Sequence, residues 1–224
     1  MIKKFLLLLL IFNLTPQTSS AAAPQELNLS RLNTSQLEDI YEYYDYKGVR
    51  GYLMLPGYHY PPIYLSSFPT DFDAVADEQK RIALFIKILA PLALRFNQQT
   101  LEQRQVIEQI KQNFDKNHEL SAEESRIIEK NAAEYDVFTR LKGYQRHKFL
   151  LTELLNRVDA IPPSFLIAAA AMETNWGTSR IVKEGNSLYK QLVWHSDKGL
   201  KPRGETEDDT YRIRTFPTIY DSLQ

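Results

Sequence analysis

The segment "IPPSFLIAAAAMETNWG", residues 161–177, decides how the rest of the chain is arranged. Pro162 and Pro163 end the preceding segment and favour the first turn of a helix. The stretch that follows is apolar on nearly every side, and a helix of this kind is usually central and buried. Gly177 tolerates the positive φ that commonly ends a helix. The sequence therefore predicts a buried helix against which other helices pack.

A lone carboxylate, Glu173, lies in the last turn of this predicted helix. Burial against alanines and Trp176 would disfavour its charged form, and so would the partial negative charge at the helix C-terminus. A carboxyl group that stays protonated can donate a proton to a leaving group. Trp176 follows three residues later, on the same helical face, where its ring could shield the acid or stack on a sugar. Alternatively, Glu173 points to water or binds a neighbouring loop amide, and the pattern alone favours neither interpretation.

Helical signals dominate from about residue 71. Asp77 is a candidate N-cap for a helix that Pro91 would kink or interrupt before the pattern resumes toward Phe114. The "SAEE" motif at 121–124 matches a capping box and predicts a second helix that runs to about Leu141. Gly143 then precedes a further helix. Three or four helices are thus expected before residue 161.

The two ends of the chain have a different texture. Tyrosines and prolines through residues 24–70 predict an irregular arm laid over the domain. Residues 188–195 and 210–216 are rich in β-branched and aromatic side chains and flank a polar stretch, which predicts a β-hairpin with a long charged loop. Residues 217–224 look like the start of a helix, so we expect the chain to be truncated at its C-terminus. The expected fold class is α+β and mostly helical.

Residues 1–23 have the layout of a secretory signal peptide. A basic start at Lys3 and Lys4 precedes an apolar run and the small residues Ala21 to Ala23. The run is shorter than the roughly 20 residues of a membrane span, and an uncleaved anchor is the alternative. The chain has no cysteine, which excludes disulfides and a thiol nucleophile. The formal net charge of -1, with dispersed Lys and Arg, argues against nucleic-acid binding.

Residues 173–179, "ETNWGTS", resemble the motif Glu-Ser/Thr-x-Trp-Gly-x-Ser of the glucosaminidase-domain family of bacterial cell-wall hydrolases. Asn186, Leu188 and Tyr189 fit that family's second motif, Asn-x-Leu-Phe/Tyr. The stretch "PPIYLSSFPTDF" and the following "RIALFIKILAPLALRFN" resemble a narrower group, the Bax-type exported proteins of Gram-negative bacteria. The resemblance covers about residues 60–224.

The resemblance implies a lysozyme-like helical lobe, a small β-lobe and a cleft between them. It implies that Glu173 is the general acid and that a second acidic residue acts from the β-lobe. Glu205 is the first choice for that residue and Glu207 the second, although Asp208 and Asp209 lie close by and a solvated acidic loop is the alternative. Two carboxylates about 6.5–9.5 Å apart would favour inversion, whereas a substrate-assisted route needs only one protein acid. The family also continues past the β-lobe with helices that carry a pocket tyrosine.

The predicted function is hydrolysis of the β-1,4 bond after N-acetylglucosamine in peptidoglycan glycan strands by an exported, periplasmic or envelope-associated protein. Names for this family also mention amidase activity. We expect a monomer that needs no cofactor. We also expect no metal site, because the four histidines form no metal-binding motif. The alternatives are a lytic transglycosylase and a non-catalytic wall-binding or scaffold protein. The residues expected to shape the sugar groove are Trp176, Asn186, Tyr189 and Trp194.

Overall fold

The computed structural model describes residues 26–47, 49–50, 53–54, 59–194, 198–202 and 210–224. Over these residues the fold is α+β and mostly helical, as predicted. The predicted signal peptide, residues 1–23, lies outside the described residues. The helices are α1 (Thr34–Tyr43), α2 (Glu78–Asn117), α3 (Ala122–Glu134), α4 (Gly143–Arg157), α5 (Pro163–Thr174) and α6 (Arg180–Gly185), with a short 3-10 helix at Phe72–Ala74.

The described strands form three separate pairs. Strand β1 (Leu27–Leu29) runs parallel to β4 (Ile63–Leu65), and β2 (Val49–Arg50) runs antiparallel to β3 (Leu53–Met54). Strand β5 (Leu192–Trp194) pairs antiparallel with β6 (Tyr211–Ile213), with Val193 opposite Arg212. The predicted C-terminal hairpin is therefore confirmed.

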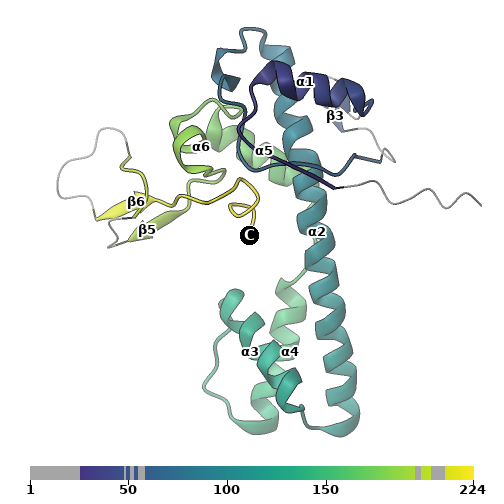
Figure 1. Cartoon of the computed structure of the whole chain (residues 1–224). Coiled ribbons are helices and arrows are strands. Elements are labelled where there is room, and N and C mark those ends of the chain that lie inside the picture. The colour runs from purple at the N-terminus through teal and green to yellow at the C-terminus, as the bar shows by residue number, and fades with distance from the viewer. Residues whose placement is uncertain (1–25, 48, 51–52, 55–58, 195–197, 203–209) are drawn as a thin grey trace, which may run out of the picture.

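Helix α2 is the axis of the molecule (Figure 1). Its 40 residues span about 60 Å, with α1, α5 and α6 beside one half and α3 and α4 beside the other. The Asp77 carboxylate caps the helix by accepting from the Lys80 N–H, as predicted. Of the two predicted effects of Pro91, an interruption is wrong, because the helix continues through this residue, and a kink stays a prediction. Pro91 is buried between Ala90 and Leu92, so burial of this apolar segment offsets the lost backbone hydrogen bond.

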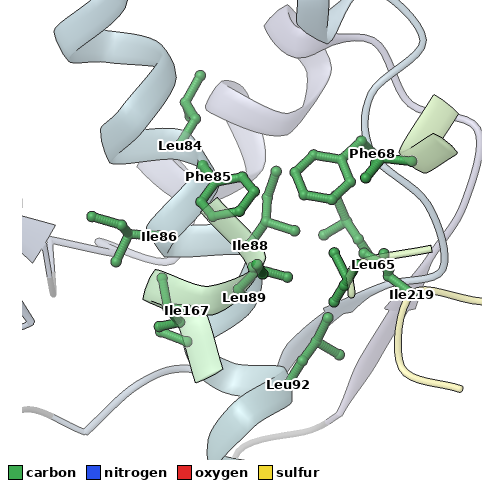
Figure 2. Close-up of a cluster of buried hydrophobic side chains, with 14 of the residues drawn as sticks. Leu65, Phe68, Leu84, Phe85, Ile86, Ile88, Leu89, Leu92, Ile167 and Ile219 are labelled. Carbon is green, nitrogen blue, oxygen red and sulfur yellow. The ribbon is translucent and has the colours of Figure 1, made fainter. Parts of the chain in front are cut away.

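The long helix carries two hydrophobic cores. In the first, Phe85 and Leu89 of α2 pack with Ile167 of α5 and with Leu65 and Ile219 from distant parts of the chain (Figure 2). In the second, Ile107 and Phe114 of α2 pack with residues of α3 and α4, namely Ile128, Ala132, Leu150, Leu151 and Leu154. The predicted site segment thus belongs to the first core alone.

Two polar side chains of α2 attach the start of α5. The side-chain amide of Asn97 donates to the Ile161 carbonyl and its oxygen accepts from the Ile161 N–H, at 2.6 and 3.0 Å. The Arg104 guanidinium donates to the carbonyls of Leu155 and Val158 at 2.7 and 2.8 Å. These bonds satisfy backbone groups at the end of α4 and in the connection to α5. They therefore hold against α2 the segment that leads from the second core to the first.

The predictions for the other helices are confirmed in part. Ser121 and Glu124 form the predicted capping box at the start of α3, but α3 ends at Glu134 rather than near Leu141. Helix α5 begins at Pro163, as predicted, and buries residues against α2. It is not buried on every side, because Phe165 and Met172 are exposed on its outer face. The last residues, 217–224, form turns and no helix.

The prediction of an irregular arm over residues 24–70 is wrong for residues 34–43, which form helix α1. Helix α1 begins with a capping box between Asn33 and Gln36. Its buried residues Leu37 and Tyr41 belong to the first core. The capping box and the burial of one helical face stabilise α1 despite its many tyrosines. This segment is therefore an integral part of the domain.

Gly177 provides a test of the first core. A Cβ at this position would lie 2.9 Å from the Phe68 ring and 3.0 Å from those of Phe72 and Phe85, at a φ of +79°. Steric overlap and positive φ together predict that Gly177→Ala lowers the free energy of unfolding by about 3 kcal/mol in urea denaturation. Gly143→Ala is the matched control, because Gly143 has a φ of +54° and open space around it, and a loss of about 1 kcal/mol is expected. Equal losses for the two variants would contradict the steric account.

Candidate functional site

A tight turn follows α5 and is fixed by Thr174. The Thr174 side chain is fully buried, and its hydroxyl donates to the Ala170 carbonyl at 2.5 Å while it accepts from the Gly177 N–H at 3.0 Å. Because successive residues of an α-helix are about 100° apart, inward placement of Ala170 and Thr174 turns Glu173 outward.

Glu173 is therefore exposed at the C-terminal end of α5. Its side chain is 42% accessible, and its Oε2 atom lies 3.5 Å from the Lys190 Nζ. Of the two interpretations of Glu173, burial is wrong and exposure to water is confirmed, since the inward face of α5 is occupied by alanines and Thr174. Its predicted position in the last turn of the helix is confirmed.

Trp176 lies beyond the helix, so the predicted helical spacing to Glu173 does not apply. Its backbone has a φ of +55°, and its N–H donates to the Ala171 carbonyl at 3.0 Å. The indole ring packs edge-to-face on Phe85 with the ring centroids 5.6 Å apart, at the margin of the first core. Its main observed contact is thus with the core.

A groove of about 490 Å³ lies where the turn after α5, helix α6 and the hairpin meet. Polar side chains of Asn175, Thr178 and Lys190 line it together with Pro202 and Ile213 from the hairpin region. Glu173 does not line this groove, but its ion-pair partner Lys190 does. The carboxylate therefore lies next to the groove.

Several residues at or near this groove have positive φ angles. Trp176 and Lys190 have φ values of +55° and +52°, a region that bulky side chains rarely adopt. Asn175 and Asn186 also have positive φ, but asparagine tolerates it. Each strained residue costs about 1–3 kcal/mol and persists only where the surrounding structure imposes it, a pattern common at functional sites.

The other predicted sugar-binding residues have different surroundings. The Asn186 side chain donates to the carbonyls of Phe216 and Pro217, both at 3.1 Å, and so joins α6 to the chain after β6. The Tyr189 hydroxyl donates to the Leu166 carbonyl at 3.2 Å, and burial raises the pKa of this phenol. Both side chains thus hold α5, α6 and the following segment together. Trp194 is 60% exposed on β5, where its ring packs on Tyr211 at 5.4 Å, and is accessible to a ligand.

Glu205 and Glu207, predicted as the second acid, lie outside the described residues. Sequence reasoning missed Lys190, because no local pattern links it to Glu173 across the turn and α6. Ser179 is the last residue of the motif at 173–179, and its hydroxyl is buried beside the groove without a hydrogen-bond partner in the described part of the chain. No group of three or more potential metal ligands occurs among the described residues.

Within the described ranges, no helix combines the length and the apolar character needed to cross a membrane. Comparisons of the chain with protein-family models, curated proteins and solved structures found no match. The resemblance to glucosaminidase domains therefore depends on the motif residues alone, and the lysozyme-like likeness stays a prediction.

Removal of the Thr174 hydroxyl tests the turn. In Thr174→Val the Gly177 N–H loses its acceptor in a buried site, and the free energy of unfolding is expected to fall by about 1–3 kcal/mol. Thr152→Val is the control, because the Thr152 hydroxyl makes the same bond to a carbonyl four residues earlier but is exposed. We expect this control to change stability by less than about 0.5 kcal/mol in thermal or urea unfolding.

Proposed function

We propose that this chain is an exported peptidoglycan hydrolase that cleaves the β-1,4 glycosidic bond after N-acetylglucosamine. Glu173 is the proton donor in this proposal. The observation that carries it is the position of Glu173, which emerges from the end of a rigid apolar helix beside a groove between the helical part and the hairpin. The buried Thr174–Gly177 turn holds the adjacent backbone, and catalytic groups need such fixed placement.

In this proposal the glycan lies along the groove with its scissile bond at Glu173. The carboxyl group donates its proton to the leaving glycosidic oxygen. Lys190, at the rim, is placed to bind an oxygen of the neighbouring sugar. Glu205 or Glu207 would activate water from the loop between β5 and β6, or the acetamido group of the substrate would take that role.

Glu173→Gln keeps the size of the side chain but removes the transferable proton. We expect cleavage of purified peptidoglycan to fall by about 10²- to 10⁴-fold, because general acid catalysis contributes about that factor. Released reducing ends, with mass spectrometry of the fragments, measure it. Products with reducing N-acetylglucosamine support the proposal, whereas anhydromuramyl products would identify a lytic transglycosylase.

Glu153→Gln is the matched control. Glu153 of α4 is 32% accessible and forms an ion pair with Arg157 at 4.0 Å, in the half of the molecule that contains the second core. It therefore has a similarly exposed carboxylate with a weak ion pair, away from the groove. Full activity of this variant is expected, and an equal loss in both variants would attribute the effect to general destabilisation.

A second candidate, non-catalytic binding to the cell wall, is favoured by one observation. Glu173 is largely exposed and ion-paired, whereas a general acid is typically held in an apolar pocket. In that case the groove and the exposed ring of Trp194 would bind glycan without cleaving it. Retention on wall sacculi with no released reducing ends would support this candidate.

Trp194 is expected to contribute to glycan binding under either candidate. Stacking of an exposed indole on a sugar is worth about 0.5–1.5 kcal/mol, so Trp194→Ala should weaken binding to sacculi about 2- to 12-fold. Phe138→Ala is the control, because Phe138 is an aromatic residue that is 73% exposed between α3 and α4. Equal weakening by both substitutions in a sedimentation assay would argue against a specific role of Trp194.

A further inference from the structure

A second pocket, of about 380 Å³, lies beside the first core. Its walls come from the carboxyl ends of the parallel strands β1 and β4, from the middle of α2, and from the turn after β6. The residues used below are Ser30, Tyr64, Ser66, Leu92, Arg95 and Tyr220. A volume at the low end of the range for ligand sites indicates a small ligand.

Arg95 is the central group of this pocket. Its guanidinium carbon lies 4.5 Å from the centroid of the Tyr64 ring and 5.5 Å from that of Tyr220, so both rings make cation–π contacts with it. Burial raises the pKa of both phenols, so neither ring contributes a negative charge that would balance Arg95. Since the side chain is only 30% accessible, the rings hold the guanidinium in place.

Arg95 has one weak ionic partner among the described residues. The Glu26 Oε2 atom lies 3.5 Å from the Arg95 Nη1, beyond the 2.7–2.9 Å typical of a charge-assisted hydrogen bond. Glu26 is 56% accessible and directly precedes β1. In the described part of the chain, the side-chain hydroxyls of Ser30 and Ser66 make no hydrogen bond. The pocket thus combines the planar guanidinium of Arg95 with two hydroxyls and aromatic walls. The carboxylate of Glu26 already lies near this guanidinium.

We infer that this pocket binds the terminal carboxylate of a short peptide. The Arg95 fork matches the two oxygens of a carboxylate, and the hydroxyls of Ser30 and Ser66 supply further donors. The apolar wall at Leu92 suits a small apolar side chain beside that carboxylate. Glu26 is then an internal competitor that the peptide displaces. This inference does not rest on the proposed glycosidase function.

The test is a titration of the ¹⁵N-labelled full chain with N-acetyl-alanyl-alanine, followed by NMR of the Arg95 Nε–H and of the backbone amides of Ser30 and Ser66. The C-terminal amide of the same dipeptide is the matched ligand, and we expect it to bind about tenfold more weakly because charge-assisted hydrogen bonds are lost. Arg95→Gln should weaken binding of the acid by a similar factor. Arg126→Gln, at an exposed arginine of α3, should leave it unchanged.

The variant Glu26→Gln distinguishes a ligand-binding role of Arg95 from a purely structural role of Arg95. Loss of the competing carboxylate should tighten binding of the dipeptide about two- to fivefold, given the strength of exposed ion pairs. The measurement with Glu26→Gln also tests the inference if the Arg95→Gln variant fails to fold. Equal affinity for the acid and the amide, or unchanged affinity in Glu26→Gln, would overturn the inference. Equal or tighter binding of glucuronate would overturn the assignment to a peptide in favour of an acidic sugar.

Discussion

The close approach of the Gly177 backbone to three phenylalanine rings is the contact on which the rest of the structure depends. Phe68 and Phe72 come from the segment before α2, and Phe85 comes from α2 itself. The contact therefore joins the end of α5 to two neighbouring segments, the start of α2 and the residues before it, which lie far from Gly177 in sequence. It also places the end of α5, because the buried Thr174 bonds the same glycine. The outward direction of Glu173 is a consequence of this packing.

Helix α2 contributes residues to both hydrophobic cores, which lie against different halves of the helix. The first core supports the groove and the Arg95 pocket, whereas the second packs α3 and α4 against the far half of the helix. The polar contacts of Asn97 and Arg104 connect the halves by holding the segment that leads into α5. The half of the molecule that contains the second core therefore affects the groove beside Glu173 indirectly, because it helps to position the start of α5.

The two ligand sites that we propose have different chemistry. The groove beside Glu173 is lined by amide, hydroxyl and apolar groups and by two cations, Arg180 and Lys190, that form ion pairs with Glu184 and Glu173. The hydrogen-bonding groups of this lining suit a sugar. The Arg95 pocket has a cation between aromatic rings, which suits an anionic group. Peptidoglycan carries both sugars and peptides, so engagement of two sites on one polymer would raise the overall affinity above that of either site.

Features that depend on neighbouring residues could be predicted from the amino-acid sequence. The caps at Asp77 and Ser121, the start of α5 at Pro163 and the C-terminal hairpin were all predicted, since each follows from hydrogen bonds or periodicity within a few residues. The sequence left open whether Glu173 is buried or exposed, and the tertiary structure determines that it is exposed. The tertiary structure also determines the Lys190 ion pair, the continuation of α2 through Pro91 and the Tyr64–Arg95–Tyr220 arrangement. These features depend on which distant side chains fill the space beside each element, and local patterns do not encode that.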